Sequence, residues 1–191
     1  ILPGGTVERK KMVLLLLCNS VAGGACGYFL IDAWGQDFFW LDYLRMTLTC
    51  TALCGAAITD FLRKKIPNIL SLVLACGGIV FCLLDFLLRP EEAAGFARSS
   101  LIGVLGMAAI LGICRLISRG GIGMGDIKIL SAMGLVIGLT GSLFTLIYAQ
   151  ILAVLAAVVL LLMRRLQLKD SIPFAPFFPW GFLICMIVGT Y

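Results

Sequence analysis

The chain has 191 residues, of which 61% are hydrophobic and only 13% are charged, and its formal net charge is +5. This composition excludes a soluble globular domain, and the apolar runs are too many and too widely spread to form one signal peptide. The sequence therefore predicts an all-α, polytopic membrane protein. In such a protein the basic residues mark cytoplasmic loops rather than a nucleic-acid-binding surface.

The chain contains eight cysteines and no histidine. The cysteines lie inside apolar runs without CxxC spacing, so we predict no metal site and no cofactor. Cys50 and Cys54 are one helical turn apart, which is compatible with a metal or redox role as well as with packing. Without histidine, Ser–His and Cys–His catalysis are excluded within this chain, and carboxylates must do most of any chemistry.

The amino-terminal part of the chain divides into three segments. Residues 1–11 are short and basic, and are either native or a remnant of cloning ahead of a start at Met12. A first membrane span is predicted over residues 12–31, and residues 32–42 form a loop with tryptophans typical of the membrane interface. No domain boundary follows, so residues 12–191 are predicted to form a single membrane-embedded domain.

Three further spans follow in the middle of the chain. They are predicted over residues 41–60, 69–88 and 101–118, with residues 89–92 opening a loop before the last of them. Pro67 disfavours helix in the residue before it and therefore separates two of these spans. Pro67 and Asn68 are predicted to shape the exit from the earlier helix and to cap the next one.

The next apolar segment is unusually short. Residues 127–139 would form about 20 Å of helix at 1.5 Å per residue, against a hydrocarbon core of ~30 Å. We therefore predict a tilted half-span or a re-entrant helix that Thr140 and Gly141 turn. A full span over residues 142–163 and a last span ending at Tyr191 would bring the total to six or seven.

The distribution of basic residues predicts an orientation. With a cytoplasmic amino terminus, all Lys and Arg residues except Arg45, Arg89 and Arg98 fall on the cytoplasmic side, as the positive-inside rule requires. The same orientation places Asp60 and Asp126 at the cytoplasmic ends of their spans. We therefore predict that the amino terminus and both aspartates face the cytoplasm.

Two acidic residues stand out by their positions. Asp126 follows four glycines in six residues and opens an apolar segment, and Asp60 ends another apolar run beside a basic cluster. A carboxylate at such a place is costly and requires a reason. The glycines allow a second backbone, or a bound peptide, to approach closely. Two lone acids at matching positions predict a single site.

A pair of carboxylates can hydrolyse an amide without histidine, a cysteine nucleophile or a metal. Two acids a few ångströms apart share a proton. The ionised acid takes a proton from water while the protonated acid hydrogen-bonds the scissile carbonyl, as in aspartic proteases. Intramembrane acids also couple ion transport or pair with lysines such as Lys128. A small carboxylate-dependent, proton-coupled transporter is therefore the alternative.

Three motifs in this chain resemble those of the type IV prepilin peptidase family. Asp60 is followed by six residues and then Pro67 and Asn68, the run G-I-G-M-G-D-I-K ends at Lys128, and residues 172–177 read I-P-F-A-P-F. The G-M-G-D run is also the GxGD signature shared with archaeal preflagellin peptidases and presenilin-like proteases. The motifs occur in the family's order and spacing.

The resemblance implies an aspartic endopeptidase of the inner membrane that removes the leader from a prepilin or pseudopilin, just cytoplasmic of its hydrophobic helix. Asp60 and Asp126 match the two catalytic aspartates of the family. The residues expected to support the site are Gly123, Gly125, Lys128, Pro67 and Asn68. Lys128 is expected to tune the charge of the acid pair, to bind a substrate carboxylate or to anchor the helix.

One departure from the family concerns a second activity. Many bacterial members have a cytoplasmic domain with paired CxxC motifs and also methylate the new amino terminus. This sequence shows no such motifs. We therefore expect a minimal, peptidase-only form, whose partners are the substrate and the lipid bilayer.

Overall fold

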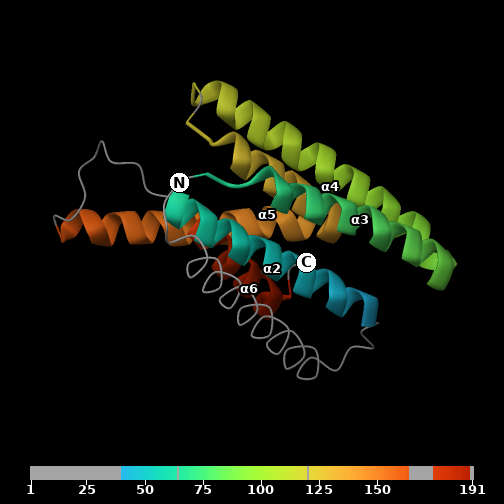
Figure 1. The fold of residues 1–191 in the computed structure, drawn as a ribbon. Coiled ribbons are helices and arrows are strands. Elements are labelled where there is room, and N and C mark those ends of the chain that lie inside the picture. Colours follow the sequence, from blue (N-terminus) through green and yellow to red (C-terminus); the bar gives the residue numbers. More distant parts are fainter. Residues whose placement is uncertain (1–39, 64, 120, 164–173, 190–191) are drawn as a thin grey trace, which may run out of the picture.

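The computed structural model describes residues 40–63, 65–119, 121–163 and 174–189. Within these ranges the chain is all-helical, as the sequence predicts (Figure 1). The elements are α2 (Trp40–Arg63), α3 (Asn68–Leu88), α4 (Pro90–Ile117), α5 (Met124–Leu162), the short 3-10 helix η1 (Ala175–Phe177) and α6 (Phe178–Val188). The basic segment 1–11 and the predicted span 12–31 lie outside the described residues.

Three of the described helices, α3, α4 and α5, are long and apolar enough to cross a membrane. Their outward faces expose many large aliphatic side chains, such as Leu87 and Leu116, which only a lipid environment accommodates. The chain is therefore a multi-pass membrane protein. Helix α2 differs because it includes charged residues toward both ends, among them Arg45 and Asp60.

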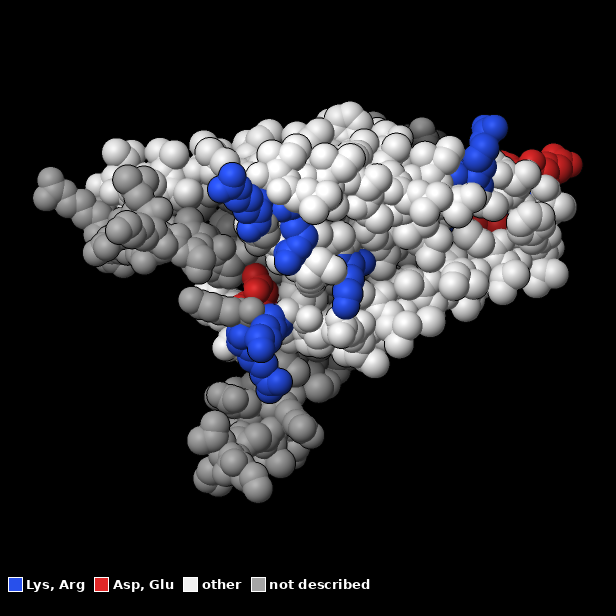
Figure 2. Space-filling model, turned by 90° about the horizontal axis from the view of Figure 1, so that it is seen from above, with Lys and Arg blue, Asp and Glu red and all other residues white. Residues whose placement is uncertain are grey.

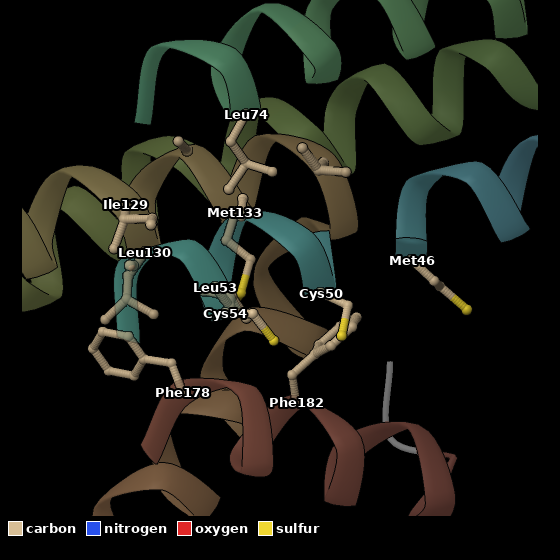
Figure 3. Close-up of a cluster of buried hydrophobic side chains, with 14 of the residues drawn as sticks. Met46, Cys50, Leu53, Cys54, Leu74, Ile129, Leu130, Met133, Phe178 and Phe182 are labelled. Carbon is tan, nitrogen blue, oxygen red and sulfur yellow. The ribbon is translucent and has the colours of Figure 1, made fainter. Parts of the chain in front are cut away.

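The core lies where α5 meets the other helices. Buried side chains from α2, α3, α5 and α6 converge there (Figure 3), including Leu74, Met133 and Phe182. Cys50 and Cys54 are buried in the same cluster, so both thiols pack as small apolar groups. Among lipid tails this packing, rather than exclusion of water, provides most of the attraction between helices.

Glycines bring α4 and α5 into backbone contact. A Cβ atom added to Gly103 would lie 2.1 Å from the carbonyl oxygen of Gly134, and one added to Gly134 would lie 2.5 Å from that of Gly103. No side chain fits between the two backbones. Such close approach through small residues is typical of membrane helices.

Helix α4 begins earlier than the sequence predicts. Residues 89–92 do not form a loop, because α4 starts at Pro90 and includes Glu91 and Glu92 in its first turn. Proline favours the first helical position, since its fixed φ suits the helix and its missing N–H has no partner there. The two acids are favoured by the positive end of the helix dipole. Only Arg89 separates α3 from α4.

The predicted short helix after the glycine stretch is present, but its end is displaced. Thr140 and Gly141 are helical, and the interruption lies at Gly138, whose φ of 76° and ψ of −179° are not helical. Glycine is suited to this position because a side chain would be strained at positive φ and would meet Ser99. The two arms of α5 consequently point in different directions (Figure 1).

The last predicted span is too long. Helix α6 has 11 residues, which amounts to about 17 Å and does not cross a full hydrocarbon core. The helix begins only at Phe178, after the 3-10 turn of η1, and ends at Gly189. Gly189 adopts the left-handed conformation, with φ of 70°, that commonly terminates helices.

Candidate active site

The fold brings Asp60 and Asp126 to the same end of the helix bundle. Asp60 lies in the last turn of α2 and Asp126 in the first turn of α5. Both side chains are partly exposed. In the part of the chain that the structure describes, no Lys or Arg forms an ion pair with either acid. The two carboxylates therefore lie at one end of the bundle without an ion-pair partner among the described residues.

Asp126 is positioned by the start of its own helix. Gly123 is the N-cap of α5, and the side chain of Asp126 folds back over the backbone of this glycine. A Cβ atom at Gly123 would lie only 2.9 Å from Oδ2 of Asp126. An acid at the third helical position commonly turns back toward the N-cap in this way. The absence of a side chain at position 123 thus leaves room for the carboxylate.

Asp60 is held by the carboxyl-terminal part of the chain. The backbone N–H of Ala175 donates a hydrogen bond to Oδ2 of Asp60, at 3.3 Å, and Ala175 is fully buried in η1. Sequence reasoning missed this donor, because a backbone N–H leaves no signature in the residue type. One signal was available: between Pro173 and Pro176, which have no N–H, Ala175 retains one.

The linker between α2 and α3 packs on the start of α5. The Cβ atom of Ile66 lies 3.0 Å from the position that a Cβ of Gly125 would occupy. Lys128 Nζ donates a hydrogen bond to Oδ1 of Asn68, at 3.1 Å. Pro67 and Asn68 lie at the start of α3, as predicted: Pro67 is the N-cap and Asn68 the first helical residue, although no side-chain cap forms.

The linker between α4 and α5 is also held by a basic residue. Arg115 donates a hydrogen bond to the carbonyl oxygen of Ile122, one residue ahead of Gly123. The hydroxyl of Ser118 accepts a hydrogen bond from the backbone N–H of Gly121, at 3.2 Å. The sequence predicted Arg115 only as a marker of the cytoplasmic side. Its contact indicates a further role in shaping the approach to Asp126.

The surface near the acids is basic. On the face shown in Figure 2, charged side chains form two groups that are separated by uncharged surface. The exposed basic residues on the segments that flank the two acids are Arg63, Lys65, Arg119 and Lys128. Among the described residues, no three His, Cys, Asp or Glu side chains group as metal ligands would.

Comparison with known families assigns the chain to one of them. Residues 47–161 match the type IV leader peptidase family. Because the match covers more than half of the chain, the protein belongs to this family, as its motifs predict. The matched range includes Asp60 and Asp126 together with all five residues expected to support the site.

Three bacterial relatives are similar to this chain, and each is named a prepilin leader peptidase/N-methyltransferase. The protein from Bacillus subtilis is 30% identical over 152 residues, which are 78% of this chain and 57% of the relative. The Aeromonas hydrophila protein is 25% identical over 177 residues, covering 92% of this chain and 58% of the relative. The Xanthomonas campestris pv. campestris protein is 26% identical over 147 residues, covering 76% and 50%.

The chain therefore spans between half and three fifths of the length of these relatives. No solved structure matches it.

Proposed function

We propose that this chain is an aspartic endopeptidase that cleaves the leader of type IV prepilin-like substrates at the cytoplasmic face of the inner membrane. One observation supports this most strongly. In a member of the type IV leader peptidase family, Asp60 and Asp126 come from different helices and lie at the same end of the bundle. Neither acid pairs with a Lys or Arg among the described residues.

The two carboxylates would act as one unit. Like charges at short range favour a state in which one acid is ionised and the other protonated. The ionised carboxylate accepts a proton from water as the water oxygen attacks the scissile carbonyl carbon. The protonated carboxylate donates to the carbonyl oxygen. Collapse of the tetrahedral intermediate then breaks the C–N bond, and a proton passes to the leaving amine.

The proposed topology extends the described helices. Helices α2 to α6, together with the span predicted over residues 12–31, would give six to seven membrane segments in one domain over residues 12–191. The short first arm of α5 would be the half-length segment. The amino terminus and both acids would face the cytoplasm, since this orientation leaves only Arg45, Arg89 and Arg98 on the other side.

The transporter alternative has less support. A proton-coupled transporter requires acidic or polar groups along a path through the bilayer. Apart from Asp60 and Asp126, the acids within the described helices include Asp42 and Asp85, and both are paired with arginines. These ion pairs favour a structural role for the second set of acids.

The test is to co-express the protein with a prepilin and to follow the prepilin by electrophoresis. We expect a mobility shift of the size of the leader with the wild-type protein, and none with Asp60→Asn or Asp126→Asn proteins present at the same level. Mass spectrometry of the new amino terminus would test the peptidase-only form, for which we expect no methyl group. A prepilin that keeps its leader beside well-expressed wild-type protein would contradict the proposed function.

A further inference from the structure

Lys128 contacts the α2–α3 linker rather than either acid. Its Nζ lies 3.1 Å from Oδ1 of Asn68, and it forms no ion pair with Asp60 or Asp126. Asn68 is the first residue of α3, and the linker before it begins after Arg63, in the same last turn of α2 that carries Asp60. Lys128 therefore connects the helix that presents one acid to the segment that follows the other.

A second contact lies close by. Ile66, in the same linker, packs over Gly125. Gly125 directly precedes Asp126, and Lys128 lies two residues after Asp126. The linker is thus seated on α5 at one point on either side of Asp126. Pro67, with φ of −65° and ψ of 134°, keeps the chain extended between these two contacts.

We infer that Lys128 and Asn68 are positioning residues, whose hydrogen bond fixes the linker on α5 and so sets the separation of the two aspartates. This inference rests on the proposed function. It assigns Lys128 neither to the substrate nor to the charge of Asp126. Small displacements of reacting groups lower catalytic rates strongly, so an exposed hydrogen bond of this kind can affect the reaction more than the stability of the protein.

The test compares Lys128→Ala, Asn68→Ala and the double variant in leader cleavage with purified protein in detergent. We expect each single variant to lower kcat by about three- to tenfold, the range of one charge-assisted hydrogen bond, with little change in KM. The double variant should be no worse than either single one. Lys128→Arg, which keeps a donor, should restore most of the activity. Lys65→Ala is the matched control, because it removes a lysine charge from the linker itself, which Lys128 contacts only from α5.

Hydrogen exchange supplies a readout independent of activity. Backbone amides of residues 65–70 should exchange faster in Lys128→Ala than in the wild type, and not in Asp126→Asn. Additive losses in the double variant, a rise in KM alone, or unchanged exchange in Lys128→Ala would each overturn the inference. Failure of the proposed function has a different signature: either the wild-type protein would leave the leader in place, or Asp60→Asn and Asp126→Asn would cleave normally, whatever the exchange of the linker.

Discussion

The two ends of the helix bundle differ in whether their acidic residues form ion pairs with basic residues. At the end away from Asp60 and Asp126, α2, α3 and the start of α4 form an ion-pair network of Asp42, Arg45, Asp85, Arg89 and Glu92. Asp85 is fully buried and bonds both arginines. Arg89 also donates two hydrogen bonds to Asp42, both at 3.0 Å.

Aromatic rings complete this network. The guanidinium of Arg45 lies 4.7 Å from the centroid of the Phe96 ring, and that of Arg89 lies 5.0 Å from the same ring. Such cation–π contacts stabilise arginine side chains that are buried away from water. Asp42, Asp85 and Glu92 at this end each have an arginine partner. The network joins α2, α3 and α4 where α3 and α4 are separated by a single residue.

At the end with Asp60 and Asp126, the described residues form no ion pair with either acid. The basic residues at this end are close in space, yet Lys128 and Arg115 bind an amide and a backbone carbonyl rather than the acids. Two acids without a basic partner among the described residues repel each other, which a purely structural site would avoid. The contrast supports the proposal that the first network contributes stability and that the acid pair serves the reaction.

The largest expected effect is loss of cleavage at the acid pair. Asp60→Asn and Asp126→Asn should each lower the rate by more than about a thousandfold, and the double variant should be no worse, because members of one catalytic unit are not additive. Removing one of two like charges should leave the thermal stability unchanged or raised. Single-turnover cleavage and thermal unfolding in detergent measure the two effects. Substantial activity in either single variant would contradict the proposed catalytic role of the two aspartates.

At the opposite end, stability should change instead of activity. Asp85→Asn leaves two arginines facing an amide in a buried site, and we expect the free energy of unfolding to fall by about 3–5 kcal/mol. Cleavage per folded molecule should stay near the wild-type value. Glu92→Gln is the matched control, because Glu92 is 63% exposed and 3.7 Å from Arg89, and its loss should cost less than about 1 kcal/mol.

Denaturant titration in detergent, with cleavage measured on the folded fraction, tests this pair of variants. If Asp85→Asn proves stable but inactive, the ion-pair network is not merely structural and the division between the two ends is wrong.

The sequence predicted that Asp60 and Asp126 lie at one end of the bundle, but it did not predict the path of the chain around them. Asp60 and Asp126 could be paired from sequence because a charge at the end of an apolar run is rare, and because both acids fall on one side of the membrane. Their partners are harder to foresee. The N–H of Ala175 and the carbonyl of Ile122 are backbone groups, which every residue type offers. Only the folded chain shows which of them faces a side chain.

The errors in the fold have a common origin. Hydropathy locates apolar segments but does not mark where a helix begins or bends. Residues 89–92 look like a loop by charge, although Pro90 and the two acids after it suit a first helical turn. Likewise Thr140 and Gly141 look like a turn. The bend lies instead at Gly138, where Ser99 of α4 approaches too closely for any side chain.

The smallest expected effect concerns the glycines beside Asp126. From sequence, Gly123 and Gly125 are expected to give the substrate peptide room for close approach. The structure suggests a different use, since Asp126 Oδ2 occupies the space over Gly123 and Ile66 that over Gly125. Gly123→Val should therefore displace the carboxylate itself and lower kcat, whereas Gly125→Val should displace the linker.

The two uses of the glycines differ in their kinetics. If the glycines make room for substrate, Gly123→Val and Gly125→Val should both raise KM. If they make room for the protein's own groups, kcat should fall in both, more in Gly123→Val, because a Cβ there meets the reacting carboxylate directly. Gly121→Val is the control, since a Cβ at Gly121 would meet only Ser118. Steady-state cleavage is compared with detergent-extracted yield and thermal stability for each protein. Normal processing by well-folded Gly123→Val and Gly125→Val proteins would remove both glycines from the mechanism and leave the two aspartates positioned by hydrogen bonds alone.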